Sequence, residues 1–150
     1  MAEGLRGDNV LLQMFRTAVA TRELMQRAVA GTGISPAEFA VLSAIGVLRS
    51  VPPTELATAL RVPPTSISRH VARIVDAGLA VRSPNPADRR SYLLELTDEG
   101  RAVARAVAPR VRSLVDQLAA RADVPQIESA LVELEEAARS IALDTPTARQ

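Results

Sequence analysis

The side chains in this sequence that could do chemistry are hydrogen-bond donors and cations, and they gather between Pro64 and Gly100. Residues 65–77 predict a helix, because four apolar side chains recur at helical spacing: Ile67, Val71, Ile74 and Val75. Its other faces carry hydroxyl, guanidinium and imidazole groups, on Ser66, Ser68, Arg69, His70 and Arg73. Such groups can bond to the base edges and phosphates of a DNA groove.

A predicted hairpin follows this helix directly. Gly78 supplies a helix-ending residue, and two β-prone runs, Leu79–Val81 and Tyr92–Leu96, flank a loop rich in Pro, Asn and Asp. The loop ends in Arg89 and Arg90. A polar-faced helix followed by an arginine-tipped hairpin is typical of the recognition helix and wing of a winged helix-turn-helix.

No catalytic or metal-binding set accompanies these residues. The sequence has no Cys and one His, which excludes disulfides and thiolate–metal sites and leaves little for zinc chemistry. It shows no glycine-rich phosphate loop and no paired carboxylates in a plausible cleft. We therefore expect no enzymatic activity, no cofactor and no metal.

Length and charge fit one DNA-binding protomer. A chain of 150 residues that is 47% hydrophobic predicts a single domain over 1–150. Its net charge of +1 hides an asymmetry, because residues 61–94 hold six Arg against two Asp, whereas 122–150 hold two Arg against six acidic residues. The positive segment coincides with the predicted helix and hairpin, which favours a polyanionic partner there.

The same composition predicts a cytoplasmic protein without membrane contact. No apolar run approaches the ~20 residues of a membrane span. Residues 1–10 lack the apolar centre of a secretory signal.

Three predicted helices precede the recognition helix. Asp8 can cap a long helix that runs to about Ala30. Ser35-Pro36-Ala37-Glu38 forms a capping box with Pro at the first helical position, and predicts a helix ending near Gly46. Glu55 to Leu60 predicts a short helix, and residues 61–63 predict the turn that completes a helix-turn-helix.

Two predicted helices follow the hairpin. Thr97 can cap the first, in which Pro109 predicts a kink or a break. Asp123 can cap the second, and residues beyond 143 resemble a loose tail. Together with the first helix, which has Leu11, Phe15, Ala18, Met25 and Val29 along one stripe, these two helices carry more apolar stripe than one small domain covers. Their apolar positions are Val103, Val107, Val111, Leu114, Leu118, Ile127, Leu131, Leu134, Ala138 and Ile141. The stripes can pack on their own domain, but we favour a symmetric dimer with a shared bundle.

Two motifs resemble those of the MarR family (multiple antibiotic resistance regulators). Residues 88–91 (DRRS) and 94–100 (LELTDEG) are similar to its wing pattern, D-x-R-S followed by L-x-L-T-x-x-G. Residues 68–79 (SRHVARIVDAGL) resemble its recognition helix and exit, and 55–57 (ELA) its third helix. The resemblance covers about 8–143 and implies a mostly α fold with a small β-wing, a winged helix-turn-helix plus a helical dimerisation bundle (α+β).

The resemblance also implies function and organisation. It implies a homodimeric transcriptional regulator, usually a repressor, that binds a pseudo-palindromic operator in double-stranded DNA and is released by an aromatic or phenolic small molecule. The winged helix-turn-helix lobe would span 34–99, and the dimerisation helices 8–33 and 100–143. The alternative is a helical dimer with a degenerate winged helix that acts through a protein partner.

Residue roles follow from the same resemblance. Arg90 would enter the minor groove, Asp88 would hold it in place, and Arg89 would face phosphate. Base edges or backbone would be contacted by Thr65, Ser66, Ser68, Arg69 and His70, and phosphate by Arg73. The sequence departs from the family at Arg61, where a small turn residue is common, and at Pro63-Pro64, where a Ser or Thr cap is common.

A ligand cleft is expected between the dimer bundle and the DNA-binding lobe. Phe15 and Phe39 lie on helices that would line it, although such residues are more often core. Arg16 or Arg22 would meet a ligand carboxylate there.

Overall fold

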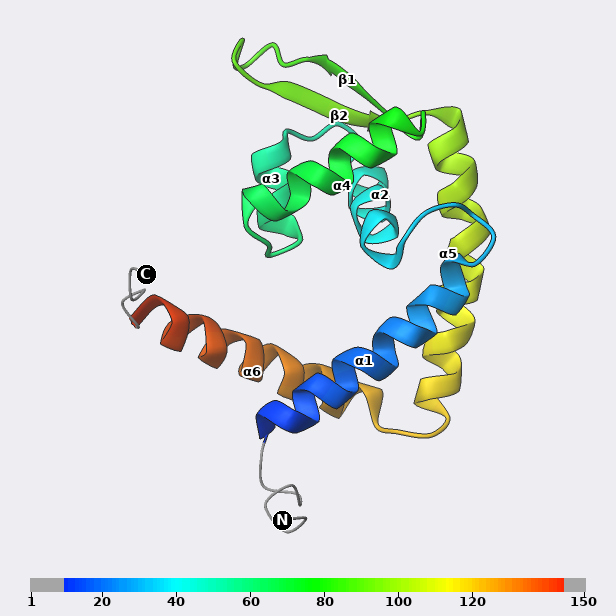
Figure 1. The fold of residues 1–150 in the computed structure, drawn as a ribbon, viewed down its shortest axis with the longest axis vertical. Helices are drawn as coiled ribbons and strands as arrows, with labels where there is room; N and C mark the ends of the chain where they lie inside the picture. Colours follow the sequence, from blue (N-terminus) through cyan, green and yellow to red (C-terminus); the bar gives the residue numbers. More distant parts are fainter. Residues whose placement is uncertain (1–9, 145–150) are drawn as a thin grey trace. The chain divides into compact units, whose positions relative to one another are not determined.

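The computed structural model describes residues 10–144, which form six helices and a two-stranded antiparallel sheet (Figure 1). The elements are α1 (Val10–Val29), α2 (Pro36–Leu48), α3 (Pro53–Ala59), α4 (Pro64–Asp76), β1 (Ala80–Pro84), β2 (Tyr92–Leu96), α5 (Asp98–Ala119) and α6 (Val124–Asp144). The chain divides into two compact units, and the boundary between them lies after Arg112, within α5. The predicted mostly helical fold with a small β-wing is confirmed. The predicted Asp8 cap and the predicted tail beyond 144 lie outside the described residues.

The core of the first unit lies between α2, α3, α4 and the sheet. Its largest fully buried side chains are Leu42, Ile45, Leu56, Ile67, Ile74, Leu94, Val51 and Val71. The predicted inward face of α4 is confirmed, since Ile67, Val71 and Ile74 are buried and Val75 packs against the core. Burial of these side chains fixes which face of α4 remains outside.

Helix α2 begins at the predicted capping box. The Ser35 hydroxyl accepts a hydrogen bond from the Glu38 backbone N–H at 3.2 Å, and the Glu38 carboxylate accepts one from the Ser35 N–H at 2.8 Å. The helix ends two residues later than predicted, because Gly46 remains helical. Arg49, with φ 71° and ψ −58°, turns the chain out of the helix in a γ-turn closed by the Ser50 N–H on the Leu48 carbonyl at 2.9 Å.

The wing is longer on its first strand than the sequence predicts. Strand β1 spans Ala80–Pro84 instead of 79–81, because it pairs along all of β2, from Ala80↔Leu96 to Pro84↔Tyr92. Val51 adds a β-bridge to Leu94, with hydrogen bonds of 3.2 and 2.9 Å. Sequence patterns did not predict this bridge, since one isolated residue has no periodicity.

A tight junction joins α4, the wing and α5. Gly78, at φ 71°, ends α4 with two hydrogen bonds of 2.9 Å, from its own N–H to Val75 and from the Leu79 N–H to Ile74. The Thr97 hydroxyl caps α5 as predicted, accepting from the Gly100 N–H at 3.0 Å and donating to the Gly78 carbonyl at 2.7 Å. The two ends of the wing are thereby tied together.

Helix α5 continues through Pro109, so the predicted break does not occur. Before Pro109, Val107 is fully buried. One residue after it, the Arg110 guanidinium donates to the carbonyls of Ala28 and Ala30, at 3.3 and 2.8 Å. A cation at the carboxyl end of α1 is favourable for the helix dipole and satisfies terminal carbonyls. These contacts hold α5 against α1 and offset the hydrogen bond that proline removes.

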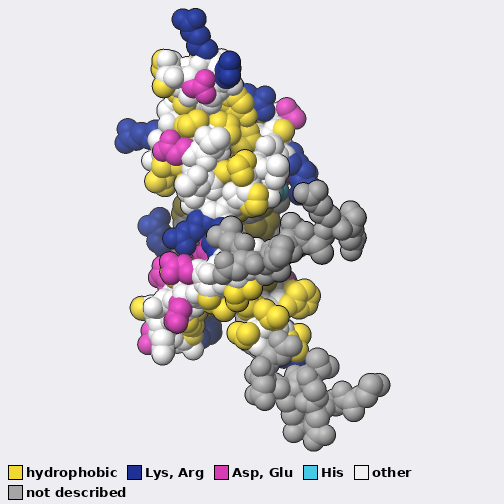
Figure 2. All heavy atoms as spheres, turned by 90° about the vertical axis from the view of Figure 1, so that its left-hand side faces the viewer, with side chains coloured by type: hydrophobic (Ala, Val, Ile, Leu, Met, Phe, Trp, Pro, Cys, Tyr) yellow, Lys and Arg dark blue, Asp and Glu magenta, His cyan; other side chains and the backbone are white. Residues whose placement is uncertain are grey.

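Apolar side chains remain at the surface of α1 and α6, and Figure 2 shows hydrophobic side chains (yellow) on the exposed surface. Phe15 is 67% exposed in α1, and Leu131 is 50% exposed in α6. The Asp123 carboxylate caps α6 as predicted, accepting from the Gln126 N–H at 3.1 Å. Within residues 10–144, no helix has both the length and the hydropathy to cross a membrane.

We predict that Gly100→Ala strongly destabilises the fold. A Cβ at position 100 would lie 1.9 Å from the backbone oxygen of Leu79, which cannot rotate away. We expect a loss of about 3 kcal/mol or more in the free energy of unfolding, measured by urea denaturation at fixed protein concentration.

The matched control is Gly46→Ala in α2, whose Cβ would meet only the Leu96 side chain at 3.3 Å. Alanine is the better helix former by about 0.5–1 kcal/mol, which offsets a small shift of that side chain. Equal stability of the two variants would contradict the proposed close approach.

Candidate nucleic-acid interface

Helix α4 presents the predicted polar face to the outside. Thr65, Ser66, Ser68 and Arg69 are exposed, opposite the buried Ile67 and Val71. The Ser68 hydroxyl donates to the Pro64 carbonyl at 3.0 Å, which leaves its oxygen lone pairs as acceptors. His70 is half-buried, and its Nδ1 atom is buried without a hydrogen-bond partner among the described residues. The helix therefore offers donors and acceptors over its first two turns.

The start of α4 differs by one residue from the prediction. The helix begins at Pro64, and Pro63 in the N-cap position offers no side-chain hydrogen bond, as expected for this pair. Proline suits the first helical position because its φ is already helical and it lacks an N–H that would need a partner. The proline ring thus replaces the missing cap in defining the start of the helix.

Arg61 forms the turn before α4 in a left-handed conformation. Its φ is 52°, and its N–H donates to the Thr58 carbonyl at 3.0 Å, while the Val62 N–H donates to Ala57 at 3.0 Å. Residues with a Cβ adopt this region at a cost of about 1–2 kcal/mol, which explains why a small residue is common here in similar sequences. The chain therefore accommodates an arginine at position 61, where similar sequences commonly have a small residue, as a strained turn.

Glu38 links α2 to the recognition helix through Arg73. The Nε atom of Arg73 lies 2.6 Å from a Glu38 carboxylate oxygen, and Glu38 is 3% exposed. The second carboxylate oxygen accepts the capping bond from Ser35. A buried carboxylate is stable when it is paired and hydrogen-bonded in this way. The sequence pattern identified Glu38 only as a cap, and Arg73 only as a phosphate ligand, which stays a prediction.

The wing tip is folded by its own side chains. The Asn85 side chain accepts from the Ala87 N–H at 3.0 Å, and the Asp88 carboxylate accepts from the Arg90 backbone N–H at 2.9 Å. Asp88, Arg89 and Arg90 are all exposed. The predicted contact between the Asp88 carboxylate and the Arg90 guanidinium stays a prediction for a DNA-bound state. Figure 2 shows arginine side chains (dark blue) projecting at the end of the molecule that carries the hairpin.

A cation stacks on the aromatic ring near the loop end of the wing strands. The Arg82 guanidinium on β1 lies 4.9 Å from the centre of the Tyr92 ring on β2. A cation over an aromatic face stabilises this cross-strand pair. Tyr92 lies at the loop end of the wing, where it pairs with Pro84, and not at the base, where Ala80 pairs with Leu96.

The predicted ligand residues are only partly brought together. Arg22 lines a cavity of about 440 Å³ with Gln26, the first turn of α2, and Arg69, His70 and Arg73 of α4. Phe39 is buried in α2, and Phe15 and Arg16 are exposed on α1; none of the three belongs to the described lining of this cavity. Sequence reasoning missed the α4 side of the cavity, because no pattern shows that α1 and α4 approach the start of α2.

This geometry defines the class of protein. A helix-turn-helix of α3 and α4, followed by an arginine-tipped hairpin at the edge of the same core, is a winged helix-turn-helix. The MarR family model matches residues 32–91. Over these residues the chain is similar to the MarR family of transcriptional regulators.

Known relatives agree in sequence and in structure. The chain is 37% identical over 70 residues to the multiple antibiotic resistance protein MarR of Escherichia coli K12, a match that covers 47% of this chain and 49% of that protein. The match thus spans about half the length of this curated relative. A mutant E. coli MarR complexed with operator DNA superposes with a TM-score of 0.73 at 28% identity, covering 83% of this chain and 92% of that one. The transcriptional repressor CouR, bound to a 23-mer DNA duplex, superposes with a TM-score of 0.74 at 27% identity. The match covers 87% of this chain and 92% of the CouR chain.

We predict that the turn at Arg61 carries backbone strain. Arg61→Gly and Arg61→Ala both remove the side chain, but only glycine adopts φ 52° without a steric penalty. We expect the Arg61→Gly variant to be more stable than the Arg61→Ala variant, with a free energy of unfolding about 1 kcal/mol higher. Chemical denaturation measures this difference. Equal stability of the two variants would show that the turn is not strained.

Proposed function

We propose that this chain binds double-stranded DNA sequence-specifically and regulates transcription. The observation that carries the proposal is the exposed polar face of α4 beside an arginine-tipped wing, both mounted on one buried core. The size of α4 suits the major groove, and an exposed arginine at a narrow hairpin suits the minor groove. The solved structures of two relatives of the same fold, at 27–28% identity, contain bound DNA, which supports the assignment.

We further propose a homodimer in which the winged lobe, 34–99, contacts DNA, and the helices within 8–33 and 100–143 associate. Its support is the exposed apolar surface of α1 and α6, which includes Phe15, Ile127 and Leu131. Exposed apolar surface of this kind on each helix marks association sites in proteins. A two-fold dimer would present two copies of α4 to half-sites about 34 Å apart, which fits a pseudo-palindromic operator.

In this proposal the protein is a cytoplasmic repressor that a small aromatic or phenolic ligand releases from DNA. The cavity beside Arg22 supports a ligand, because it touches both α1 and the recognition helix. A ligand that preferred one spacing of these helices would shift the population of DNA-binding dimers.

Selection of DNA by the purified protein tests the proposal most directly. Random duplexes that the protein retains at moderate salt are sequenced, and the selection is repeated with candidate phenolic ligands. We expect an inverted repeat, with affinity that falls steeply as salt rises. Retention without sequence enrichment would contradict sequence-specific regulation.

We predict that Arg90→Ala weakens operator binding by about 1–3 kcal/mol, because one groove contact is lost. Fluorescence polarisation at fixed salt measures the change, and circular dichroism checks the fold. The charge-matched control is Arg105→Ala, an exposed arginine on α5 that is not among the proposed DNA-contacting residues. Wild-type affinity of Arg90→Ala would remove the wing tip from the interface.

We predict that Leu131→Glu weakens self-association at least about 100-fold, because an unpaired carboxylate buried in an interface costs about 3 kcal/mol or more. Analytical ultracentrifugation over a range of concentrations measures it. The control is Val47→Glu, since Val47 is 81% exposed at the end of α2, outside the proposed dimer helices. An unchanged dimer for Leu131→Glu would place the interface elsewhere.

A further inference from the structure

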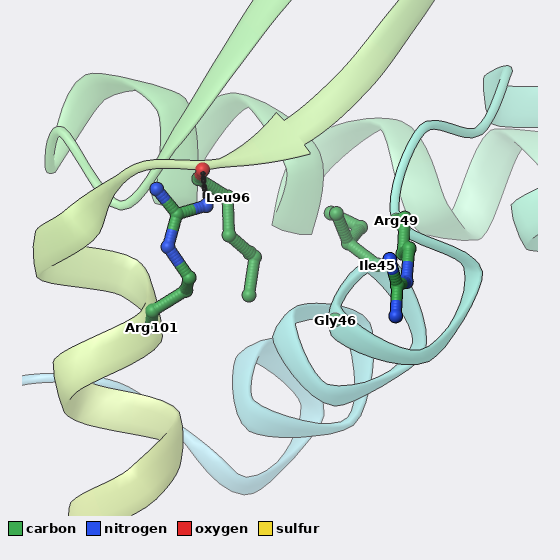
Figure 3. A pocket seen from close by; sticks show the side chains of 5 residues that line it. All are labelled: Ile45, Gly46, Arg49, Leu96 and Arg101. Carbon is green, nitrogen blue, oxygen red and sulfur yellow. Dashed lines mark hydrogen bonds between the residues drawn. The ribbon is translucent and has the colours of Figure 1, made fainter.

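A second pocket lies at the other side of the first unit, where α2 ends, β2 ends and α5 begins. It has a volume of about 330 Å³ and is lined by Ile45, Gly46, Arg49, Leu96 and Arg101. Figure 3 shows Arg101 on one side and Arg49 on the other, with the side chains of Ile45 and Leu96 between them. The volume falls within the range of small-molecule sites, about 300–1,000 Å³.

The floor of this pocket is aliphatic. Ile45 and Leu96 are buried, and no aromatic ring contributes to the described lining. Gly46 leaves the floor open, since a Cβ there would stand 3.3 Å from Leu96. A glycine inside a helix costs stability relative to alanine, so an open floor is retained at some expense. The floor suits a compact saturated hydrocarbon group.

The two arginines of this pocket, Arg101 and Arg49, differ in how their charges are balanced by neighbouring groups. Arg101 donates to the Leu96 carbonyl at 2.6 Å and to the Asp98 carboxylate at 2.7 Å. The hydrogen bond and positive charge of Arg101 lower the pKa of Asp98, so this carboxylate is ionised at neutral pH and balances the guanidinium. Arg101 therefore forms a fixed and largely neutralised wall.

Arg49 is the unbalanced cation. Within residues 10–144, its guanidinium forms no hydrogen bond or ion pair, and its side chain is exposed at the rim. Its backbone holds φ 71° and ψ −58°, a γ-turn that is strained for a residue with a Cβ. Glycine would relieve that strain but remove the charge. Strain of this kind concentrates at functional sites.

We infer that this pocket binds a small carboxylic acid anion with a branched or cyclic aliphatic body. The carboxylate pairs with Arg49, whose guanidinium matches its geometry, and the hydrocarbon lies on Ile45, Gly46 and Leu96. This site is separate from the cavity beside Arg22 and does not depend on the proposed DNA binding.

The test uses cyclohexanecarboxylate with the full-length protein and follows backbone amide shifts by NMR. We expect shifts at Gly46, Arg49 and Leu96. Two analogues separate the contributions: cyclohexanecarboxamide lacks the charge, and acetate lacks the hydrocarbon body. Each should bind at least about tenfold more weakly, since one charge-assisted hydrogen bond or the apolar contact is lost.

The decisive variant is Arg49→Gly, which removes the guanidinium and relieves the turn, so loss of folding cannot explain loss of binding. We expect its affinity to fall about tenfold or more. Arg61→Gly is the matched control, because it also replaces a left-handed arginine but lies outside the pocket, and it should bind like wild type. Equal binding of acid and amide, unchanged affinity of Arg49→Gly, or shifts confined to the surroundings of Arg22 would each overturn the inference. No DNA is present, so these outcomes are distinct from failure of the proposed function.

Discussion

The close approach of Gly100 to the Leu79 backbone is the constraint on which the winged helix-turn-helix depends. No side chain heavier than hydrogen fits at position 100, so the first turn of α5 can rest against the residue that leaves α4. Thr97 strengthens the same junction by bonding at once to Gly78 and Gly100. The recognition helix, both strands of the wing and α5 therefore share one fixed point, and the hairpin projects from it as a unit.

A second link, between the first turn of α2 and the recognition helix α4, helps to orient that helix. Glu38 uses one carboxylate oxygen to cap α2 and the other to hold Arg73 of α4. Because this carboxylate is buried, its two partners together offset the cost of removing it from water. A helix-capping residue thus also contacts α4 and supports the orientation that the buried face of this helix fixes.

Strain is confined to the two non-glycine residues with positive φ among residues 10–144, Arg49 and Arg61. Both stand at the ends of short connections, where α2 passes into the Val51 bridge and where α3 passes into α4. The buried core on either side determines these turns, so the chain accepts an unfavourable backbone for an arginine. Loops held in this way keep the helices of the lobe in one arrangement.

The sequence by itself determined the helices, their caps at Ser35, Thr97 and Asp123, and the inward face of α4, because these depend on neighbours within one or two turns. It also indicated the exposed residues of the wing tip. Only the tertiary structure decided the Val51 bridge, the extent of β1, the pairing of Glu38 with Arg73 and the two pockets. Each of these joins residues far apart in the chain, and the distance between such residues is fixed by packing, which no local pattern encodes.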